Sequence, residues 1–125
     1  MKRLFTILAI ASLASGTFFQ APEKMSYQAV VRNANGEPVK SSTVGMQISI
    51  LQGEVNGSAV YIETQKPTTN ANGLATLEIG GGTIISGTYS AIDWAHGPYF
   101  IKTETDPTGG INYTIEGTSQ LLSVP

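Results

Sequence analysis

The residues best suited to chemistry lie close together in the stretch from Ser90 to Thr105. Asp93 and His96, the chain's one histidine, stand three residues apart, and an Asp–His pair supplies two members of a hydrolytic triad. The nucleophile would have to come from the many Ser and Thr residues, none of which lies in a Gly-x-Ser-x-Gly elbow. The pattern favours a surface histidine beside a turn, and we expect a protein that is not an enzyme.

Metal and phosphate chemistry have weak support in the sequence. One histidine and no cysteine leave only carboxylates for a zinc ion. Glu104, Asp106 and Asn112 could supply oxygen ligands to Ca²⁺, but calcium loops carry more carboxylates at closer spacing, and Asp106 more simply opens a turn. The glycines at 80–82 lack the Lys-Ser/Thr pair and the following helix of a Walker loop, which favours a flexible link. We expect no metal ion and no cofactor.

Aromatic residues are the remaining candidates for binding. Trp94, Tyr99 and Tyr61 could form a platform on which a sugar stacks, together with Tyr89 and Phe100. The alternative is that these rings fill the core, which is their commoner place in a small sandwich. We keep Trp94, Tyr99 and Tyr61 as candidate contacts to a glycan or protein ligand.

Short strands must position these residues, because apolar and polar residues alternate along most of the chain. The clearest case is 43–52, where Val44, Met46, Ile48 and Ile50 fall on one face. Strands are expected at 25–32, 43–52, 59–65, 74–79, from Tyr99 onward, at 111–116 and at 119–124. Only one short helical turn is predicted, at Ser90–Ala95, from a capping-box pattern followed by Gly97-Pro98.

Turn signals between these segments predict an antiparallel arrangement. Asn33–Gly36 and the longer 66–73 segment are rich in Asn and Gly, which tolerate positive φ. The strand from Tyr99 is expected to form a hairpin with 111–116, which Gly117 then ends. About seven short strands with such turns predict an all-β, Ig-like or prealbumin-like sandwich, with a small barrel as the main alternative.

The first residues have the pattern of a secretory signal peptide. Lys2-Arg3 form a positive region, an apolar run to Leu13 follows, and Ala14–Gly16 offers small residues for cleavage. A transmembrane anchor is the alternative, but the run is shorter than the roughly 20 residues that a spanning helix requires. We therefore expect a signal peptide at 1–16, an extended leader at 17–24 and a β-sandwich domain at 25–125.

Charge and cysteine content narrow the partners. Removal of Lys2 and Arg3 with the signal changes the formal net charge from −2 to −4, and the remaining basic residues form no cluster. Nucleic acid and anionic membranes are therefore poor partners. Without cysteine, packing of the sheets must stabilise the domain. We expect an exported protein, at the cell surface, extracellular or periplasmic, with no membrane span after signal removal.

The turn segments carry a resemblance to known families. Residues 32–39 (RNANGEPV), 69–74 (TNANGL) and 97–101 (GPYFI) resemble the turns of carboxypeptidase-regulatory-like, prealbumin-type sandwich domains. Residues 24–33 (KMSYQAVVRN) and 118–125 (TSQLLSVP) are similar to the N-terminal module of Bacteroidetes-type exported surface proteins, in which collagen-like, coiled-coil or tail-fibre-like segments follow.

The second resemblance implies a structural or adhesive module and transfers no catalytic residue. It also implies further domains of the same chain as partners, since Leu121 and Leu122 would face opposite sides of a final strand and need a neighbour to cover both. The alternative is a small complete sandwich that binds a carbohydrate or a peptide.

Overall fold

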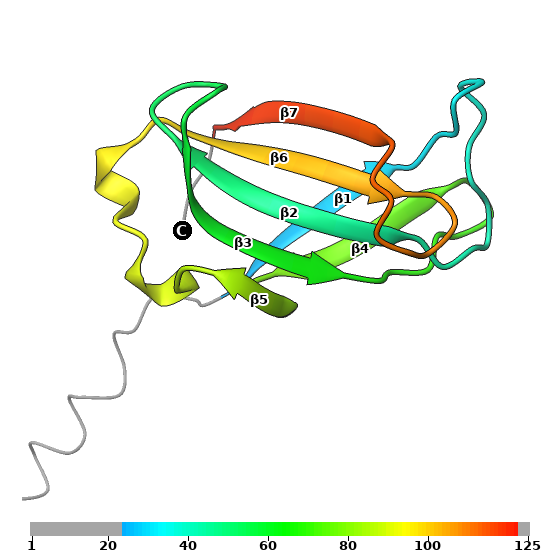
Figure 1. Ribbon diagram of the computed structural model, residues 1–125, viewed down its shortest axis with the longest axis horizontal. Helices are drawn as coiled ribbons and strands as arrows, with labels where there is room; N and C mark the ends of the chain where they lie inside the picture. Colours follow the sequence, from blue (N-terminus) through cyan, green and yellow to red (C-terminus); the bar gives the residue numbers. More distant parts are fainter. Residues whose placement is uncertain (1–23, 123–125) are drawn as a thin grey trace, which may run out of the picture.

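The computed structural model describes residues 24–122 and places seven strands in two antiparallel sheets (Figure 1). The strands are β1 (Met25–Val30), β2 (Gly45–Gln52), β3 (Ser58–Gln65), β4 (Leu74–Ile79), β5 (Thr83–Ser86), β6 (Tyr99–Asp106) and β7 (Ile115–Leu121). The larger sheet has the order β5-β3-β2-β6-β7, and β1 pairs with β4 in the smaller one. The predicted all-β sandwich of about seven strands is confirmed.

The core lies between the two sheets, and β1 and β4 run behind the larger sheet in Figure 1. Alternation along each strand sends every second side chain into this space. The buried cluster consists of Val31, Val44, Met46, Ile48, Ile50, Tyr61, Ala75, Leu77, Ile79, Tyr89, Tyr99 and Ile101. It includes the predicted inward faces of 43–52, 74–79 and the strand that begins at Tyr99.

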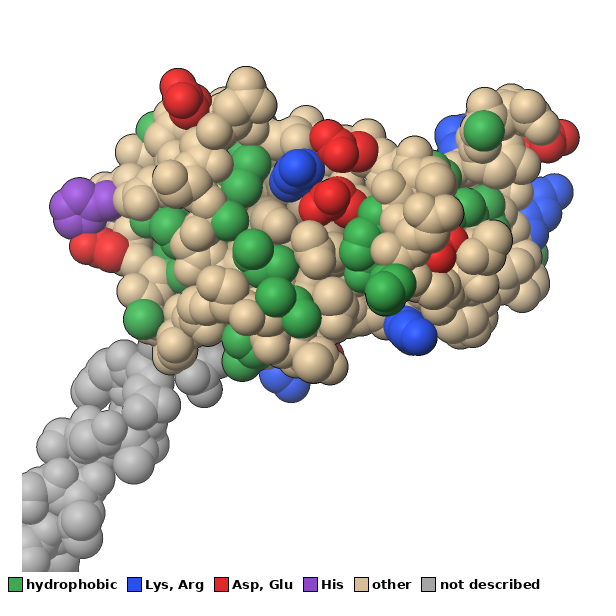
Figure 2. Space-filling model, viewed as in Figure 1, with side chains coloured by type: hydrophobic (Ala, Val, Ile, Leu, Met, Phe, Trp, Pro, Cys, Tyr) green, Lys and Arg blue, Asp and Glu red, His purple; other side chains and the backbone are tan. Residues whose placement is uncertain are grey.

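β2 is the centre of the larger sheet, hydrogen-bonded to β3 on one side and to β6 on the other. Its four predicted inward residues, Val44, Met46, Ile48 and Ile50, are at most 1% exposed. The opposite face of β2 is also covered in part, since Leu51 is only 6% exposed. Figure 2 shows apolar side chains gathered over the middle of this outer face.

Two loops at one end of the sandwich use the same four residues, Asn-Ala-Asn-Gly, at 33–36 and 70–73. In each loop the first asparagine side chain accepts hydrogen bonds from the amides two and four residues later, at 2.8–3.0 Å. Gly36 and Gly73 have φ of 79° and 81°, a conformation that glycine adopts without steric cost. The predicted turns are confirmed at both places.

The end of the chain folds differently from the prediction. The expected strands at 111–116 and 119–124 are wrong as two elements, because β7 runs unbroken from Ile115 to Leu121. Gly117 lies inside it, paired with Thr103. The start is late because the Asp106 carboxylate accepts hydrogen bonds from the Thr108 and Asn112 amides, which holds a wide loop before β7. The expected pairing with β6 does form. Residues 123–124 lie outside the described part.

β5 was not predicted as a strand. Its four residues, Thr83-Ile-Ile-Ser86, follow the glycines at 80–82 and pair with β3 at the edge of the larger sheet. The sequence has too few alternating positions here to signal a strand, and pairing with β3 supplies the missing stabilisation. The strand count agrees with the prediction because one added strand offsets the merger in β7.

The helical segment consists of two 3₁₀ turns, η1 (Tyr89–Ala91) and η2 (Trp94–His96), and the single turn expected at Ser90–Ala95 is wrong. Ile92 is extended, with ψ of 125°, and separates them. Asp93 caps η2 by accepting a hydrogen bond from the Ala95 amide at 3.2 Å. The predicted capping box therefore does not form, because Asp93 starts a second turn.

The predicted signal peptide, 1–16, and all but the last residue of the predicted leader lie outside the described residues. Between residues 24 and 122, no helix is long and apolar enough to cross a membrane.

Candidate functional site

Four aromatic rings meet at the end of the sandwich that carries the 3₁₀ turns. Tyr61 contacts Tyr89 at a centroid distance of 5.5 Å, Tyr89 contacts Trp94 at 5.8 Å, and Trp94 contacts Tyr99 at 5.1 Å. All three contacts are edge-on, which is a favoured geometry for aromatic pairs. Because the rings come from β3, the 3₁₀ turns and β6, only the tertiary fold brings them together.

Burial divides the three candidate ligand contacts. Tyr61 is 0% exposed and Tyr99 is 2% exposed, so both rings belong to the core. Trp94 is half-buried and packs against the core, which leaves part of its ring open to solvent. A flat platform of all three rings is therefore absent, and a ligand at this end would touch Trp94. Whether Trp94, Tyr99 and Tyr61 contact a ligand stays a prediction.

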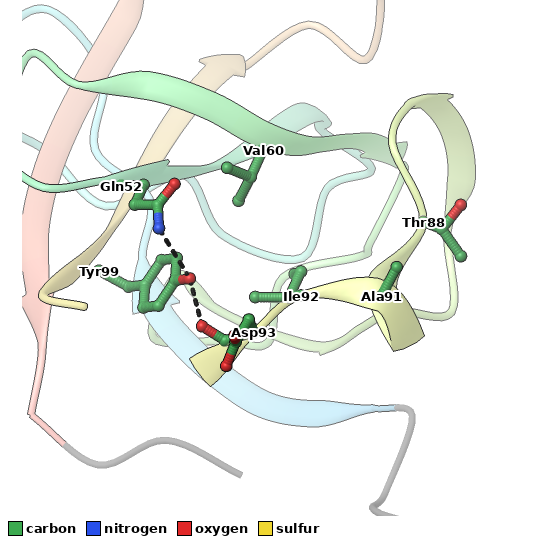
Figure 3. Close-up of a pocket in the computed structure, with 7 residues that line it drawn as sticks. All are labelled: Gln52, Val60, Thr88, Ala91, Ile92, Asp93 and Tyr99. Carbon is green, nitrogen blue, oxygen red and sulfur yellow. Dashed lines mark hydrogen bonds between the residues drawn. The ribbon is translucent and has the colours of Figure 1, made fainter. Parts of the chain in front are cut away.

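A pocket of about 300 Å³ lies beside Tyr99 (Figure 3). We call it the Tyr99 pocket; it is lined by Gln52, Val60, Thr88, Ala91, Ile92, Asp93 and Tyr99. Val60 reaches it because the pairing of β2 and β3 shifts between Ile50 and Leu51, which leaves Val60 without a partner in the ladder.

Hydrogen bonds hold the Tyr99 hydroxyl at the wall of this pocket. It donates to the Asp93 carbonyl oxygen at 2.6 Å and accepts from Gln52 Nε2 at 3.2 Å (Figure 3). Burial, and then the charge of Asp93, raise the pKa of Tyr99, so the phenol stays neutral near pH 7. The pocket therefore presents neutral donors and acceptors with apolar walls, which fits a neutral polar ligand.

The Asp93 and His96 side chains do meet, with Asp93 Oδ2 and His96 Nδ1 2.5 Å apart. Both are well exposed, at 62% and 71%. Within residues 24–122, no Ser or Thr hydroxyl forms a hydrogen bond with the imidazole. The pair lies on the surface beside a turn and lacks the buried orienting carboxylate that a triad uses.

A buried carboxylate, Glu63, was missed by the sequence reasoning. It is 0% exposed, and its Oε1 accepts hydrogen bonds from the Tyr61 hydroxyl at 2.6 Å and from the Gly80 amide at 2.7 Å. Its Oε2 accepts from Gln65 Nε2. Alternation placed Glu63 on the same face as Tyr61, and this shared face was the signal that could have revealed it.

The two tyrosines near Glu63 differ in their partners. Burial, followed by the hydrogen bond and the charge of Glu63, raises the pKa of Tyr61. Burial and then Glu63 also raise the pKa of Tyr89. The Tyr61 hydroxyl is occupied by Glu63, whereas the buried Tyr89 hydroxyl has no hydrogen-bond partner among the described residues. An unpaired buried hydroxyl is costly, which makes Tyr89 the unexplained group of this region.

The calcium alternative at the β6–β7 loop gives way to the turn interpretation. Asp106 Oδ1 accepts from the Thr108 amide at 2.9 Å and from its hydroxyl at 2.6 Å, and Oδ2 accepts from the Asn112 amide. Both oxygens thus hold the loop. Across residues 24–122, no group of three or more His, Cys, Asp or Glu side chains is placed to hold a metal ion.

Fold and site together define a small two-sheet β-sandwich with an aromatic end. Residues 26–119 match the family described as Domain of unknown function (DUF8740), and the chain belongs to that family. The matched range begins in β1 and ends in β7, so it covers both sheets. Searches of curated proteins and of solved structures found no match.

Proposed function

We propose that this domain is a non-catalytic structural or adhesive module of an exported cell-surface protein. It acts by contacting other protein chains, including further domains of its own polypeptide. The observation that carries the proposal is the uncharged edge strand β5. Its four side chains are all exposed, and Ile84 and Ile85 are 56% and 57% exposed.

The two edges of the larger sheet differ in how well they resist pairing. Proteins protect sheet edges with charged side chains, bulges or covering segments. β7 carries Glu116 within a mainly polar run, whereas β5 carries no charge and two isoleucines. Among the described residues, β5 pairs only with β3. These features favour addition of a strand from another chain at β5.

The location at the cell surface rests on the sequence. The signal-peptide pattern and the resemblance to N-terminal modules of exported surface proteins both support export. The Ig-like or prealbumin-like relationship belongs to the same proposal, and it is compatible with two packed antiparallel sheets.

Adhesion of coated beads to cells tests this proposal. Beads that carry the purified chain are expected to bind cells of an exporting host more than bare beads do. Ile85→Lys places a charge on the β5 edge and is expected to reduce binding several-fold. Ile111→Lys is the matched control, because Ile111 is 78% exposed in the loop before β7.

Equal binding by the two variants, or no binding above bare beads, would contradict a contact at β5. Reproducible hydrolytic turnover that is lost in His96→Ala would overturn the non-catalytic assignment.

The second candidate function is carbohydrate or peptide binding at the Tyr99 pocket. It is favoured by the half-buried Trp94 ring and by the neutral polar groups of Gln52 and Tyr99 nearby. A glycan array with the wild-type chain and Thr88→Val, which removes a hydroxyl from the pocket wall, separates this reading from adhesion at β5. A saturable signal that weakens in Thr88→Val and persists in Ile85→Lys would support it.

A further inference from the structure

We infer that the partner at β5 is an extended peptide segment and that a cavity beside this strand holds one neutral, mainly apolar side chain of it. The inference rests on the proposed protein contact at β5 and specifies the chemistry of the partner. The cavity, here called the Tyr89 cavity, is lined by Lys24, Tyr61, Gly80, Ile84, Thr88, Tyr89 and Ser90.

The position of the Tyr89 cavity links it to the β5 edge. Ile84 belongs to β5 and also forms a wall of the cavity. In Figure 1, β5 lies at the margin of the larger sheet, next to the segment that leads into the 3₁₀ turns. A strand added along β5 would turn every second side chain to the same face. One of those side chains would lie over the cavity.

The size of the cavity selects a side chain over a free small molecule. Its volume is about 210 Å³, whereas sites for drug-sized ligands span roughly 300–1,000 Å³. Recognition by strand addition uses this division of roles, in which backbone hydrogen bonds supply affinity and small pockets for alternate side chains supply specificity.

The Tyr89 hydroxyl is the independent sign of a ligand. Tyr89 is 5% exposed, lines the cavity and has no hydrogen-bond partner within residues 24–122. The nearest ring, Tyr61, cannot serve it, because the Tyr61 hydroxyl donates to Glu63. A carbonyl oxygen of a bound peptide would accept from the Tyr89 hydroxyl and remove the cost of leaving it unpaired.

Charge makes a neutral side chain the best occupant. The Glu63 carboxylate lies behind the cavity, and its charge contributes to the raised pKa of Tyr89. An acidic side chain would therefore meet a like charge in a poorly solvated place. Lys24 at the rim disfavours a basic one. A neutral aliphatic, thioether or amide side chain meets neither repulsion.

The test uses a displayed library of random seven-residue peptides, selected against the immobilised wild-type chain. A selected peptide is then synthesised, and its Kd is measured for wild type, Tyr89→Phe, Ile85→Lys and Ile111→Lys. Tyr89→Phe removes one hydroxyl and keeps the ring, so it is expected to fold and to melt at an equal or higher temperature.

We expect the selected peptides to share a neutral, mainly apolar residue at one position. Ile85→Lys should abolish binding, Tyr89→Phe should weaken it roughly three- to tenfold, and Ile111→Lys should leave it unchanged. Replacing the shared residue of the peptide with Asp should weaken binding to the wild-type chain.

The outcomes separate the two proposals. Peptides that bind, depend on Ile85 and are indifferent to Tyr89→Phe would overturn the inference about the cavity and leave the β5 contact standing. Peptides that show both dependences, while coated beads fail to adhere to cells, would refute the adhesive role and support the peptide site. Absence of any selected peptide would overturn the inference.

Discussion

At the scale of single residues, two carboxylates organise their surroundings without a cationic partner nearby. Glu63 accepts hydrogen bonds from Tyr61, Gln65 and the Gly80 amide inside the core. Asp106 accepts from the Thr108 amide and hydroxyl and from a distant amide in its loop. A buried charged group is tolerated when hydrogen bonds replace its hydration. Each carboxylate therefore has a structural role that substitution can measure.

Substitutions at Glu63 should differ sharply in their cost. Glu63→Leu leaves the Tyr61 hydroxyl and the Gly80 amide without an acceptor and is expected to lower the free energy of unfolding by about 2–4 kcal/mol. Glu63→Gln keeps one oxygen for these donors and should cost about 1 kcal/mol. Urea denaturation of both variants measures the difference. Equal midpoints would show that these hydrogen bonds contribute nothing to stability.

Asp106 should make stability depend on acid pH. Hydrogen bonds from the Thr108 hydroxyl and amide lower the pKa of Asp106 below its ordinary value. Its folded pKa is thus below its unfolded pKa, so its stabilisation is complete above about pH 4 and declines as pH falls through the folded pKa.

Asp106→Asn, which carries no charge at any pH, is the comparison for this effect. Thermal unfolding should find the variant less stable than wild type at pH 6, with the gap narrowing below about pH 4. A gap that stays constant down to pH 2 would contradict the prediction.

At the scale of elements, β2 determines the register of the larger sheet because it pairs along its length with both β3 and β6. Its alternation was readable from the sequence because four apolar residues recur at every second position. β5 and β7 were harder to read. β5 has only four residues, and the start of β7 depends on Asp106, whose carboxylate bonds across the preceding loop.

Two neighbouring positions in β2 should respond oppositely to a charge. Ile48→Asp places a carboxylate in a fully buried site and is expected to cost on the order of 4 kcal/mol or more. Gln47→Lys should change the free energy of unfolding by less than about 1 kcal/mol, since Gln47 already bonds Glu104 across the strands. Melting temperatures of the two purified variants compare them. Equal losses would mean that the faces of β2 are assigned wrongly.

At the scale of the whole molecule, the two ends of the sandwich differ. One end carries the two Asn-Ala-Asn-Gly loops, and the other carries the 3₁₀ turns, the aromatic rings and both cavities (Figure 1). Thr88 lines both the Tyr99 pocket and the Tyr89 cavity. The two candidate binding functions therefore belong to one end of the molecule, and variants must be chosen on either side of Thr88 to separate them.

Export is a prediction about the whole chain. Production in an exporting host should yield a mature protein cleaved between about Ala14 and Ala21, most simply after Gly16. Mass spectrometry of the secreted material gives its N-terminus. A soluble product that retains Met1 in the cytoplasm would contradict the signal-peptide assignment.

The sequence by itself determined the local part of this protein. Alternation assigned the faces of β2, β4 and β6, and Asn-Gly pairs located the turns, because these features depend on backbone geometry within a few residues. Tertiary structure decided which strands lie at the edges and which polar groups find partners. The exposed Ile84 and Ile85, the bonded Glu63 and the unpaired Tyr89 hydroxyl are consequences of contacts between distant segments. Periodicity in a sequence carries no record of such contacts, because burial and hydrogen bonding at a residue depend on whatever the fold places beside it.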